Sequence, residues 1–362
     1  MRTYRAAVIG CSRMGGFIDH EVVGHPSIVL PYSHAAGYVA CPRTELAACA
    51  DLRPDVLAAF GEQYGIPPAR RYTDYRALLQ QEQPEIVSVA TQPEQRAEIV
   101  LAAVEAGARA VYAEKAMAAS TGEAAAMVEA VERRGVVFNL GTNRRWHPGF
   151  ERMRRCIGEG EFGELRTLVA YVTGSLFNTA SHTFDLLFYL NGDVPARWVQ
   201  ANLPRGESAL DGDLLREDPV GEGLIEYENG VRAYALNTGR GTEFEAICDG
   251  GVLISGNNGD DWQIRRRVPL GIGRHTTLRA EPFPRFEHAS TTLRLIEDLV
   301  QALDAGGPTR GGVRIARANT ELIFAFVESH RRGGSRVNLP LGPCPLRLER
   351  AAAPRQPRLA AT

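Results

Sequence analysis

Short apolar runs alternate with longer amphipathic stretches through the first part of the chain. The apolar runs predict buried strands at 6–9, 45–50, 85–90, 110–113 and 136–140. The stretches between them predict helices at 54–64, 74–83, 94–106 and 121–134. Strands that alternate with helices form βαβ units, and strands buried on both faces of a parallel sheet are continuously apolar. The pattern therefore predicts an α/β domain with a doubly wound parallel sheet.

The pattern changes after residue 143. A helix is predicted at 149–158, a strand at 165–173 and a second helix at 181–190. Strand candidates then follow one another without helices between them, at 197–201, 221–227, 231–237, 244–249 and 251–255. Helical patterns return at 291–305 and 313–330. Grouped strands favour a largely antiparallel sheet, so we expect an α+β second domain.

Length and composition are those of a globular protein with two domains. We expect a first domain at 1–143, a second at 144–342, and a loose tail at 343–362 that is rich in Pro, Arg and Ala. Hydrophobic residues make up 44% of the 362 residues and charged residues 23%, which is enough apolar material for sizeable cores. The net charge of −2 argues against nucleic acid or an anionic membrane as a partner.

Neither the apolar runs nor the cysteines point to a membrane or to an oxidising compartment. No apolar run approaches the ~18 residues that a membrane-spanning helix needs, and the N-terminus has no signal-peptide core. The six cysteines are scattered, without a Cys-x-x-Cys pair, so neither a zinc site nor a redox motif is indicated. We therefore expect reduced thiols and a cytoplasmic location.

Lys115 is the only lysine in the chain. Lys and Arg together number 41, and the other 40 are arginines. Arginine therefore supplies positive charge everywhere else, which indicates that position 115 needs a property arginine lacks. A lysine ammonium is compact, and its pKa can shift toward neutrality on burial, whereas guanidinium stays charged. Lys115 is our first candidate for a catalytic residue.

A glycine-rich turn follows the first predicted strand directly. Gly10 to Gly15 reads as G-x-G-x-x-G with Ser12 in the middle glycine's place. Such a turn binds a dinucleotide pyrophosphate at a helix N-terminus, so Arg13 and Met14 are candidate cofactor contacts as well.

A candidate for binding the cofactor ribose follows the second predicted strand. Asp51 lies there, with Leu52 and Arg53 after it, and an insertion at 17–31 accounts for its long spacing from Gly10. Asp51 would bind the ribose hydroxyls and favour NAD, while Arg53 leaves NADP possible.

Four further motifs complete a family pattern. They are Ala90-Thr91-Gln92-Pro93, Glu114-Lys115-Ala116, Asn143-Arg144-Arg145-Trp146 and Asn178-Thr179-Ala180-Ser181-His182. With the glycine-rich turn, they resemble the Gfo/Idh/MocA oxidoreductases over roughly residues 4 to 342. The resemblance implies an N-terminal Rossmann domain, a C-terminal open-faced sheet that commonly forms an oligomer interface, and NAD(P)-linked oxidation or reduction of a sugar or cyclitol. A homodimer or homotetramer is the implied assembly.

The resemblance also implies roles for individual residues. Lys115 would lie beside the nicotinamide and the reacting hydroxyl, and His182 would be the general acid/base. The cofactor would also contact Thr91, Gln92, Pro93 and Glu114. The chain departs from the family at Ala116, where a proline is usual, and at Asn178, where an aspartate is usual.

The residues around His182 agree with a role in proton transfer. A histidine titrates near neutral pH, which suits removal of a hydroxyl proton. His182 precedes an apolar helical run, so we expect it at a helix N-terminus, where the dipole favours neutral imidazole. Candidate substrate contacts by position are Arg145, Trp146, Asn178 and Thr179. No histidine pair has metal-ligand spacing with a carboxylate, so we predict no metal, and we expect His34 to start a helix.

Three functions fit this pattern. The first is an NAD-dependent dehydrogenase acting on a neutral sugar, glycoside or cyclitol. The second is a glycosidase that oxidises the sugar transiently with bound NAD, and the third is a non-enzymatic dinucleotide-binding regulator. A regulator would not need Lys115 and His182 together, so their joint presence favours an enzyme.

Overall fold

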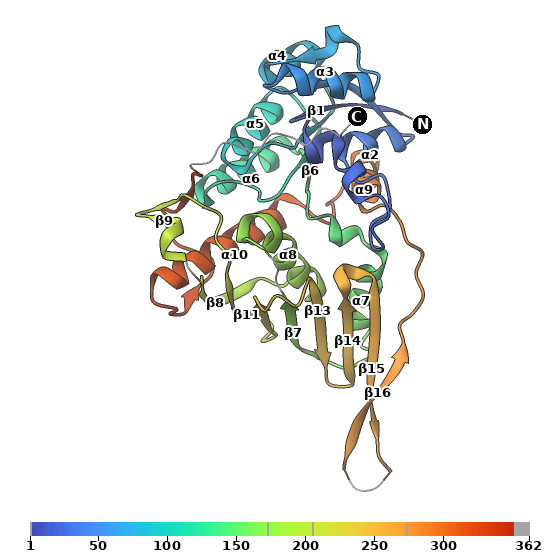
Figure 1. The fold of residues 1–362 in the computed structure, drawn as a ribbon, viewed down its shortest axis with the longest axis vertical. Coiled ribbons are helices and arrows are strands. Elements are labelled where there is room, and N and C mark those ends of the chain that lie inside the picture. The colour runs from blue at the N-terminus through green and yellow to red at the C-terminus, as the bar shows by residue number, and fades with distance from the viewer. Residues whose placement is uncertain (1, 172–173, 205, 272–273, 351–362) are drawn as a thin grey trace. The chain divides into compact units, whose positions relative to one another are not determined.

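A computed structural model describes residues 2–171, 174–204, 206–271 and 274–350 (Figure 1). The chain divides into two compact units. The first comprises Met1–Trp146, Ala289–Arg317 and the described part of Arg347–Thr362, and the second comprises His147–His288 and Ala318–Leu346. Residues 289–317, which the sequence-based division assigned to the second domain, thus return to the first unit. Most of the predicted tail, residues 351–362, lies outside the described residues.

The first unit contains a six-stranded parallel sheet in the order β3-β2-β1-β4-β5-β6. The strands are β1 (Tyr4–Ile9), β2 (Thr44–Ala50), β3 (Arg71–Tyr72), β4 (Ile86–Val89), β5 (Ala110–Ala113) and β6 (Val137–Leu140). The predicted doubly wound parallel sheet is therefore confirmed. The sequence pattern missed β3, because two residues are too few to show a strand pattern.

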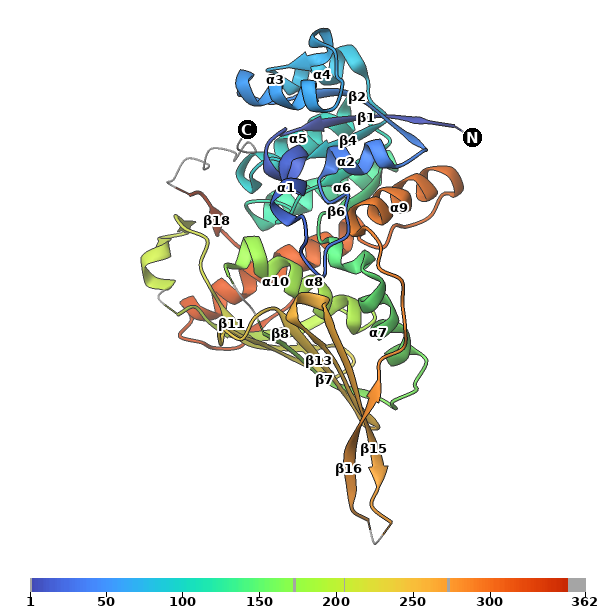
Figure 2. The same cartoon turned by 45° about the vertical axis from the view of Figure 1, so that its right-hand side comes forward.

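Helices cover both faces of this sheet (Figure 2). One face packs against α2 (His34–Ala40), α3 (Pro54–Gln63) and α9 (Thr291–Ala305). The other face packs against α4 (Tyr75–Glu82), α5 (Pro93–Glu105) and α6 (Thr121–Arg134). Shorter elements are η1 (Arg13–Phe17), α1 (Asp19–Val22), η2 (Pro68–Arg70), η3 (Asn143–Trp146) and β18 (Arg347–Leu348). The strands are buried on both sides, which explains their continuous apolar runs.

The second unit contains a nine-stranded sheet in the order β16-β15-β14-β13-β7-β12-β11-β8-β17. The strands are β7 (Leu165–Tyr171), β8 (Ala196–Asn202), β11 (Glu222–Tyr227), β12 (Arg232–Leu236), β13 (Glu243–Cys248), β14 (Gly251–Gly256), β15 (Asp261–Pro269), β16 (Thr276–Pro282) and β17 (Val337–Asn338). β7 and β12 run parallel, and the other neighbours are antiparallel. The prediction of a largely antiparallel sheet is confirmed. Residues 172–173 of the predicted strand at 165–173 lie outside the described residues.

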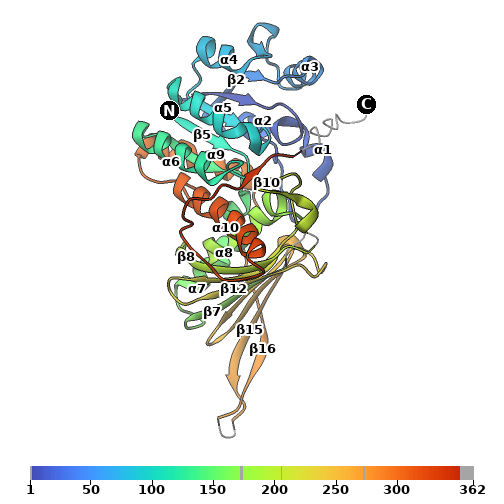
Figure 3. The same cartoon turned by 90° about the vertical axis from the view of Figure 1, so that its left-hand side faces the viewer.

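One face of this sheet is covered and the other is open. Helices α7 (Pro148–Gly158), α8 (Ser181–Leu190) and the later part of α10 (Val313–Arg331) cover the first face, with aromatic contacts such as Phe150–Phe244 and Phe188–Tyr227. Along β8, buried Val199 and Ala201 alternate with exposed Gln200 and Asn202. β15 and β16 form a hairpin that extends beyond the other strands (Figure 3). The remaining elements are η4 (Leu176–Ala180), η5 (Gly206–Ala209), β9 (Leu210–Asp211), β10 (Leu214–Leu215) and η6 (Asn257–Gly259).

One carboxylate of α9, that of Asp298, binds three partners within the first unit. Asp298 Oδ2 accepts hydrogen bonds from Asn139 Nδ2 at 3.1 Å, from Trp146 Nε1 at 3.3 Å and from the Arg310 backbone N–H at 3.0 Å. Asn139 and Trp146 are buried, so water cannot replace a lost partner without local opening. This network links β6, η3 and the segment after α9, all far apart in the sequence.

We expect Asp298→Ala to lower the free energy of unfolding by about 2–4 kcal/mol, because it leaves buried donors without an acceptor. Chemical denaturation measures the loss. Glu297→Ala, at the adjacent exposed position, is the matched control and should change stability by less than about 0.5 kcal/mol. Equal losses in the two variants would contradict the role given to the Asp298 network.

Candidate functional site

The glycine-rich turn packs directly against the loop that follows β4. Gly10 has a φ of +93°, and a Cβ there would lie 2.9 Å from the carbonyl carbon of Ala90. A Cβ on Gly15 would lie 2.0 Å from the Gly10 carbonyl oxygen. Side chains are therefore excluded at both positions, which lets the backbone form a close cradle of the kind that binds a pyrophosphate. Ser12 precedes η1, and Arg13 and Met14 are its first two residues.

Asp51 lies at the carboxyl end of β2, next to this turn. Its Oδ2 accepts a hydrogen bond from the Cys11 backbone N–H at 2.8 Å, and its Oδ1 accepts one from the Arg53 backbone N–H at 3.0 Å. Each carboxylate oxygen retains a further lone pair for a ribose hydroxyl. Leu52 is 77% exposed, and the Arg53 side chain pairs with Asp55 at 2.6 Å. The turn and the carboxylate thus meet at one edge of the sheet, as sequence spacing led us to expect.

Arg96, which the sequence analysis did not single out, joins two of the predicted cofactor segments. It is 2% exposed on α5, and its guanidinium donates to the backbone carbonyls of Thr91 and Ala116. Burial lowers the pKa of Arg96 to about 10, so the side chain stays charged at neutral pH. The Ala90–Pro93 turn and the Glu114–Ala116 segment are therefore held by one buried cation. Its sequence spacing carries no signal, because ordinary surface arginines occur at similar helix positions.

The remaining predicted cofactor residues lie near these segments. Gln92 caps α5 and accepts a hydrogen bond from Arg350 at 2.7 Å, and Pro93 is the first residue of α5. Glu114 and Lys115 follow β5 directly. Glu114 is 4% exposed, while Lys115 is partly exposed.

A buried hydrogen-bond network surrounds Glu114. His34 Nε2 lies 3.0 Å from Glu114 Oε1, and His34 Nδ1 lies 2.8 Å from Ser88 Oγ. Ser88 Oγ is in turn 3.0 Å from the Tyr38 hydroxyl. The His34 ring stacks on Tyr112 with 3.7 Å between ring centroids and 9° between planes. His34 begins α2, as expected, but it is completely buried, and its hydrogen bond to Glu114 could not be read from the sequence.

Positive charges keep Glu114 ionised. Burial raises the pKa of this carboxyl, but the hydrogen bond from His34 and the charges of His34, Lys115 and Arg96 outweigh burial and hold the pKa below its ordinary value. The attraction is mutual, so Glu114 favours the charged form of Lys115.

The other predicted catalytic residue, His182, lies in the second unit with Asn178 and Thr179. His182 is the second residue of α8 and is partly exposed. His182 lies in the first turn of α8, as expected, but η4 leads directly into this helix. The preceding residues Leu176–Ala180 are already helical, and the first N–H groups of that turn, those of Phe177 and Asn178, donate to Asp218 at 2.9 and 3.1 Å.

Asp218 is a second residue that the sequence analysis missed. Besides the two backbone N–H groups, it accepts a hydrogen bond from Ser175 Oγ at 2.7 Å. On the other side, Asn319 Nδ2 donates to the Ser181 carbonyl at 2.8 Å. These side chains come from distant parts of the chain and fix the turn that presents Asn178, Thr179 and His182. Their separation in sequence explains why no local motif revealed them.

Arg145 and Trp146 are both fully buried in the first unit. Arg145 donates to the Arg310 carbonyl at 3.2 Å, and Trp146 donates to Asp298. A buried indole with this partner resembles a core residue, so contact of Trp146 with substrate stays a prediction.

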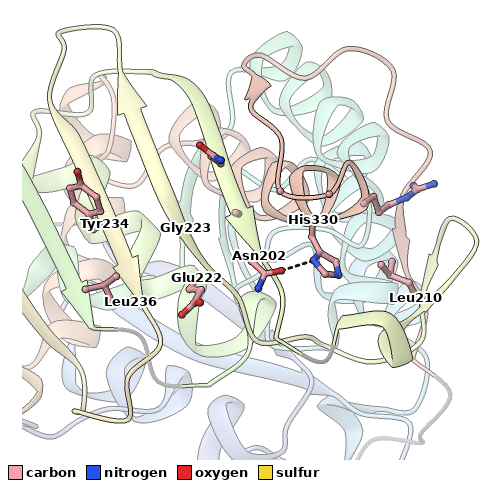
Figure 4. A pocket seen from close by; sticks show the side chains of 12 residues that line it. Asn202, Leu210, Glu222, Gly223, Tyr234, Leu236 and His330 are labelled. Atoms are coloured by element: carbon pink, nitrogen blue, oxygen red, sulfur yellow. Dashed lines mark hydrogen bonds between the residues drawn. The ribbon is translucent and has the colours of Figure 1, made fainter.

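Two cavities are lined by none of these residues. One, of about 970 Å³, is formed in the second unit by β8, β11, β12 and the end of α10, where His330 Nδ1 is 3.0 Å from Asn202 Oδ1 (Figure 4). The other, of about 780 Å³, lies among the C-terminal ends of α5, α6 and α9. Cavity size alone therefore does not identify the functional site.

The described residues contain neither a metal-ligand cluster nor a helix suited to span a membrane. Among them, no three His, Cys, Asp or Glu side chains are grouped so that they could hold a metal ion. No described helix has both the length and the apolar character needed to cross a membrane.

Several curated relatives are named as dehydrogenases of a sugar or of inositol. The chain is 27% identical over 248 residues to D-apiose dehydrogenase of Paraburkholderia graminis, an alignment covering 64% of this chain and 59% of the relative. It is 26% identical over 179 residues to inositol 2-dehydrogenase of Salmonella typhimurium, covering 46% and 52%. The chain thus matches between about half and three fifths of the length of these two proteins.

A solved structure and a family model describe the same fold. The inositol dehydrogenase homologue of Azotobacter vinelandii, crystallised with NADH and myo-inositol, superposes with a TM-score of 0.74 at 20% identity, covering 93% of this chain and 98% of that one. Residues 4–142 match the model of the oxidoreductase family with an NAD-binding Rossmann fold. The chain thus carries an NAD-binding domain of the Gfo/Idh/MocA oxidoreductase type at residues 4–142.

Proposed function

We propose that the protein is an NAD(P)-dependent dehydrogenase that transfers a hydride between the nicotinamide and a secondary hydroxyl of a sugar, glycoside or cyclitol. One observation carries the proposal. The only lysine of the chain follows buried Glu114 at the carboxyl end of β5, in an NAD-binding Rossmann domain. Ligands of open α/β sheets bind outside the carboxyl ends of the strands.

The residues of the first unit fit the cofactor. The pyrophosphate would rest on the turn from Gly10 to Gly15, where no side chain fits, and the adenosine ribose would meet Asp51. When bound, NAD supplies the hydride acceptor for alcohol oxidation. The chain's own residues must then bind the substrate and remove its hydroxyl proton.

In this proposal His182 accepts the hydroxyl proton, and Lys115 assists. The Lys115 ammonium donates a hydrogen bond to the substrate oxygen and stabilises the negative charge that develops as the proton leaves. Asn178 and Thr179, on the turn that Asp218 fixes, would bind other substrate hydroxyls. Amide and hydroxyl groups suit a neutral polyol, and the sugar and inositol dehydrogenases among the relatives support the same substrate class.

We also propose that the protein forms a homodimer or homotetramer. The open face of the second-unit sheet supports this assembly, since Tyr234 is 37% exposed there and Leu224 and Ile254 are only partly buried.

A panel of sugars, inositols and glycosides tests the function, with NAD or NADP and absorbance of the reduced nicotinamide as readout. A dehydrogenase accumulates NADH in proportion to oxidised substrate. Release of the aglycone from a glycoside without net NADH would instead favour a glycosidase with transient oxidation. Tight NAD binding with no turnover across the panel would favour a regulator.

Lys115→Met should lower kcat by about 10³-fold and Lys115→Arg by at least about 10²-fold, because a planar guanidinium cannot replace a compact ammonium. The measurement is NADH formation on the best substrate of the panel. Arg133→Lys on exposed α6 is the control and should leave kcat unchanged. Near wild-type activity of Lys115→Arg would remove Lys115 from the proposed mechanism.

NAD should bind more tightly than NADP, because the Asp51 carboxylate would face the 2′-position of the ribose and repel a phosphate there. Asp51→Ala should weaken NAD binding by about tenfold and narrow the difference between the cofactors. Calorimetry with both cofactors measures the ratio. A preference of the unmodified protein for NADP would overturn the assignment of Asp51.

Asn178→Asp should move the acidic limb of the rate profile to higher pH. A carboxylate four residues before His182 on the same helical segment stabilises imidazolium and raises the pKa of His182, so the neutral base forms only at higher pH. The expected change is roughly 0.3–1 pH unit. Rate against pH for both proteins measures it, and an unmoved limb, with His182→Ala still active, would exclude His182 as the base.

A further inference from the structure

We propose that His34 is a positioning residue for Lys115, acting through the Glu114 carboxylate. The proposal rests on the proposed function, in which the Lys115 ammonium assists hydride transfer. Every contact that carries it lies within the first unit. Neither the family motif nor the sequence pattern assigned His34 more than the start of a helix.

The Glu114 carboxylate connects His34 with Lys115. One oxygen, Oε1, faces His34 Nε2 at 3.0 Å, and the other, Oε2, accepts the Lys115 backbone N–H at 3.3 Å. The carboxylate also packs against Gly141, the residue after β6, where a Cβ would lie 2.6 Å from Oε1. With one oxygen on each partner and a glycine behind it, the carboxylate has one well-defined orientation.

The His34 ring is itself held from three directions. It stacks on Tyr112, bonds Glu114 through Nε2 and bonds Ser88 through Nδ1. Tyr112 and Glu114 are two residues apart, so they project from the same face of the β5 segment. His34 therefore stacks on Tyr112 and hydrogen-bonds Glu114. Together these contacts align the end of β5, which Lys115 follows closely.

The two ring nitrogens of His34 have complementary hydrogen-bond partners. A neutral ring can donate Nε2–H to Glu114 and accept the Ser88 hydroxyl proton at Nδ1, while Ser88 Oγ accepts from the Tyr38 hydroxyl. In this network, each donated proton of Tyr38, Ser88 and His34 then has one acceptor. The hydrogen bond and charge of His34, together with the charges of Lys115 and Arg96, hold the pKa of the Glu114 carboxyl below its ordinary value.

This arrangement gives the two ring nitrogens different importance. Nε2 fixes the carboxylate that faces Lys115, whereas Nδ1 contacts only the Ser88–Tyr38 side of the network. Glutamine places an amide nitrogen near the Nε2 position, and asparagine places a polar group near the Nδ1 position. His34→Gln should therefore preserve the contact that matters, and His34→Asn should lose it, although both remove the stacked ring.

The lone lysine allows a direct readout that needs no substrate. Labelling with [ε-¹³C]lysine gives one signal from this chain, whose shift against pH reports the titration of Lys115. We expect His34→Asn to lower the Lys115 midpoint by about one pH unit or more, since the opposing carboxylate is no longer fixed. kcat should fall at least about tenfold, with NAD affinity within about threefold of wild type.

Two control variants are compared with His34→Asn. His34→Gln should stay within about threefold of wild-type kcat and about 0.3 pH unit of its Lys115 midpoint. Tyr38→Phe, which removes the far hydroxyl of the network, should leave both unchanged. If His34→Asn does not fold, Glu114→Gln carries the same test, because an uncharged amide in the same place must also lower the Lys115 midpoint.

The proposal fails if His34→Asn, or Glu114→Gln in its place, leaves the Lys115 titration unmoved. It also fails if His34→Gln is impaired as much as His34→Asn, since the ring's shape and not its Nε2 donor would then matter. Absence of turnover in the unmodified protein would refute the proposed function. The lysine titration would still decide the role of His34.

Discussion

The close approach of two backbone segments is the constraint on which the candidate site depends. Gly10 lies so near Ala90 that a methyl group would not fit, and Gly15 lies equally near Gly10 itself. This approach brings the turn after β1 beside the turn after β4, and it places the Cys11 N–H within reach of Asp51 at the end of β2. Three strand ends thereby form one continuous edge. A side chain at either glycine would separate the segments that form the proposed cofactor site.

Charge compensation stabilises the segment that follows β5, where Glu114 is buried. Buried Glu114 cannot be solvated, so its charge is stable only because His34, Arg96 and Lys115 surround it. Arg96 serves this purpose and also joins two loops through their carbonyls, which a planar guanidinium with several donors does well. In the proposed function, the partly exposed position at 115 needs a compact cation that can approach a reacting oxygen. That need would account for the single lysine in a chain that otherwise uses arginine.

In the second unit, a carboxylate from a distant part of the sequence fixes the turn that carries His182. The family usually has an aspartate where this chain has Asn178, yet a carboxylate still reaches the turn, because Asp218 caps the backbone N–H groups of Phe177 and Asn178. A cap of this kind fixes the geometry of the helical segment that carries His182. The Asp218 carboxylate binds the start of that helical segment, whereas the family's aspartate corresponds to position 178 within it.

The sequence by itself determined the periodic features of the protein. Continuous apolar runs identified five strands of the parallel sheet, because such strands are buried on both faces, and grouped strand patterns identified the second sheet. Local spacing likewise located the glycine-rich turn, Asp51, Lys115 and His182. Only the tertiary structure decided which distant side chains support them. His34, Arg96, Asp218 and Asp298 act through hydrogen bonds across large sequence separations, and residues 289–317 return to the first unit. No local pattern encodes such contacts, because they depend on how already formed elements pack.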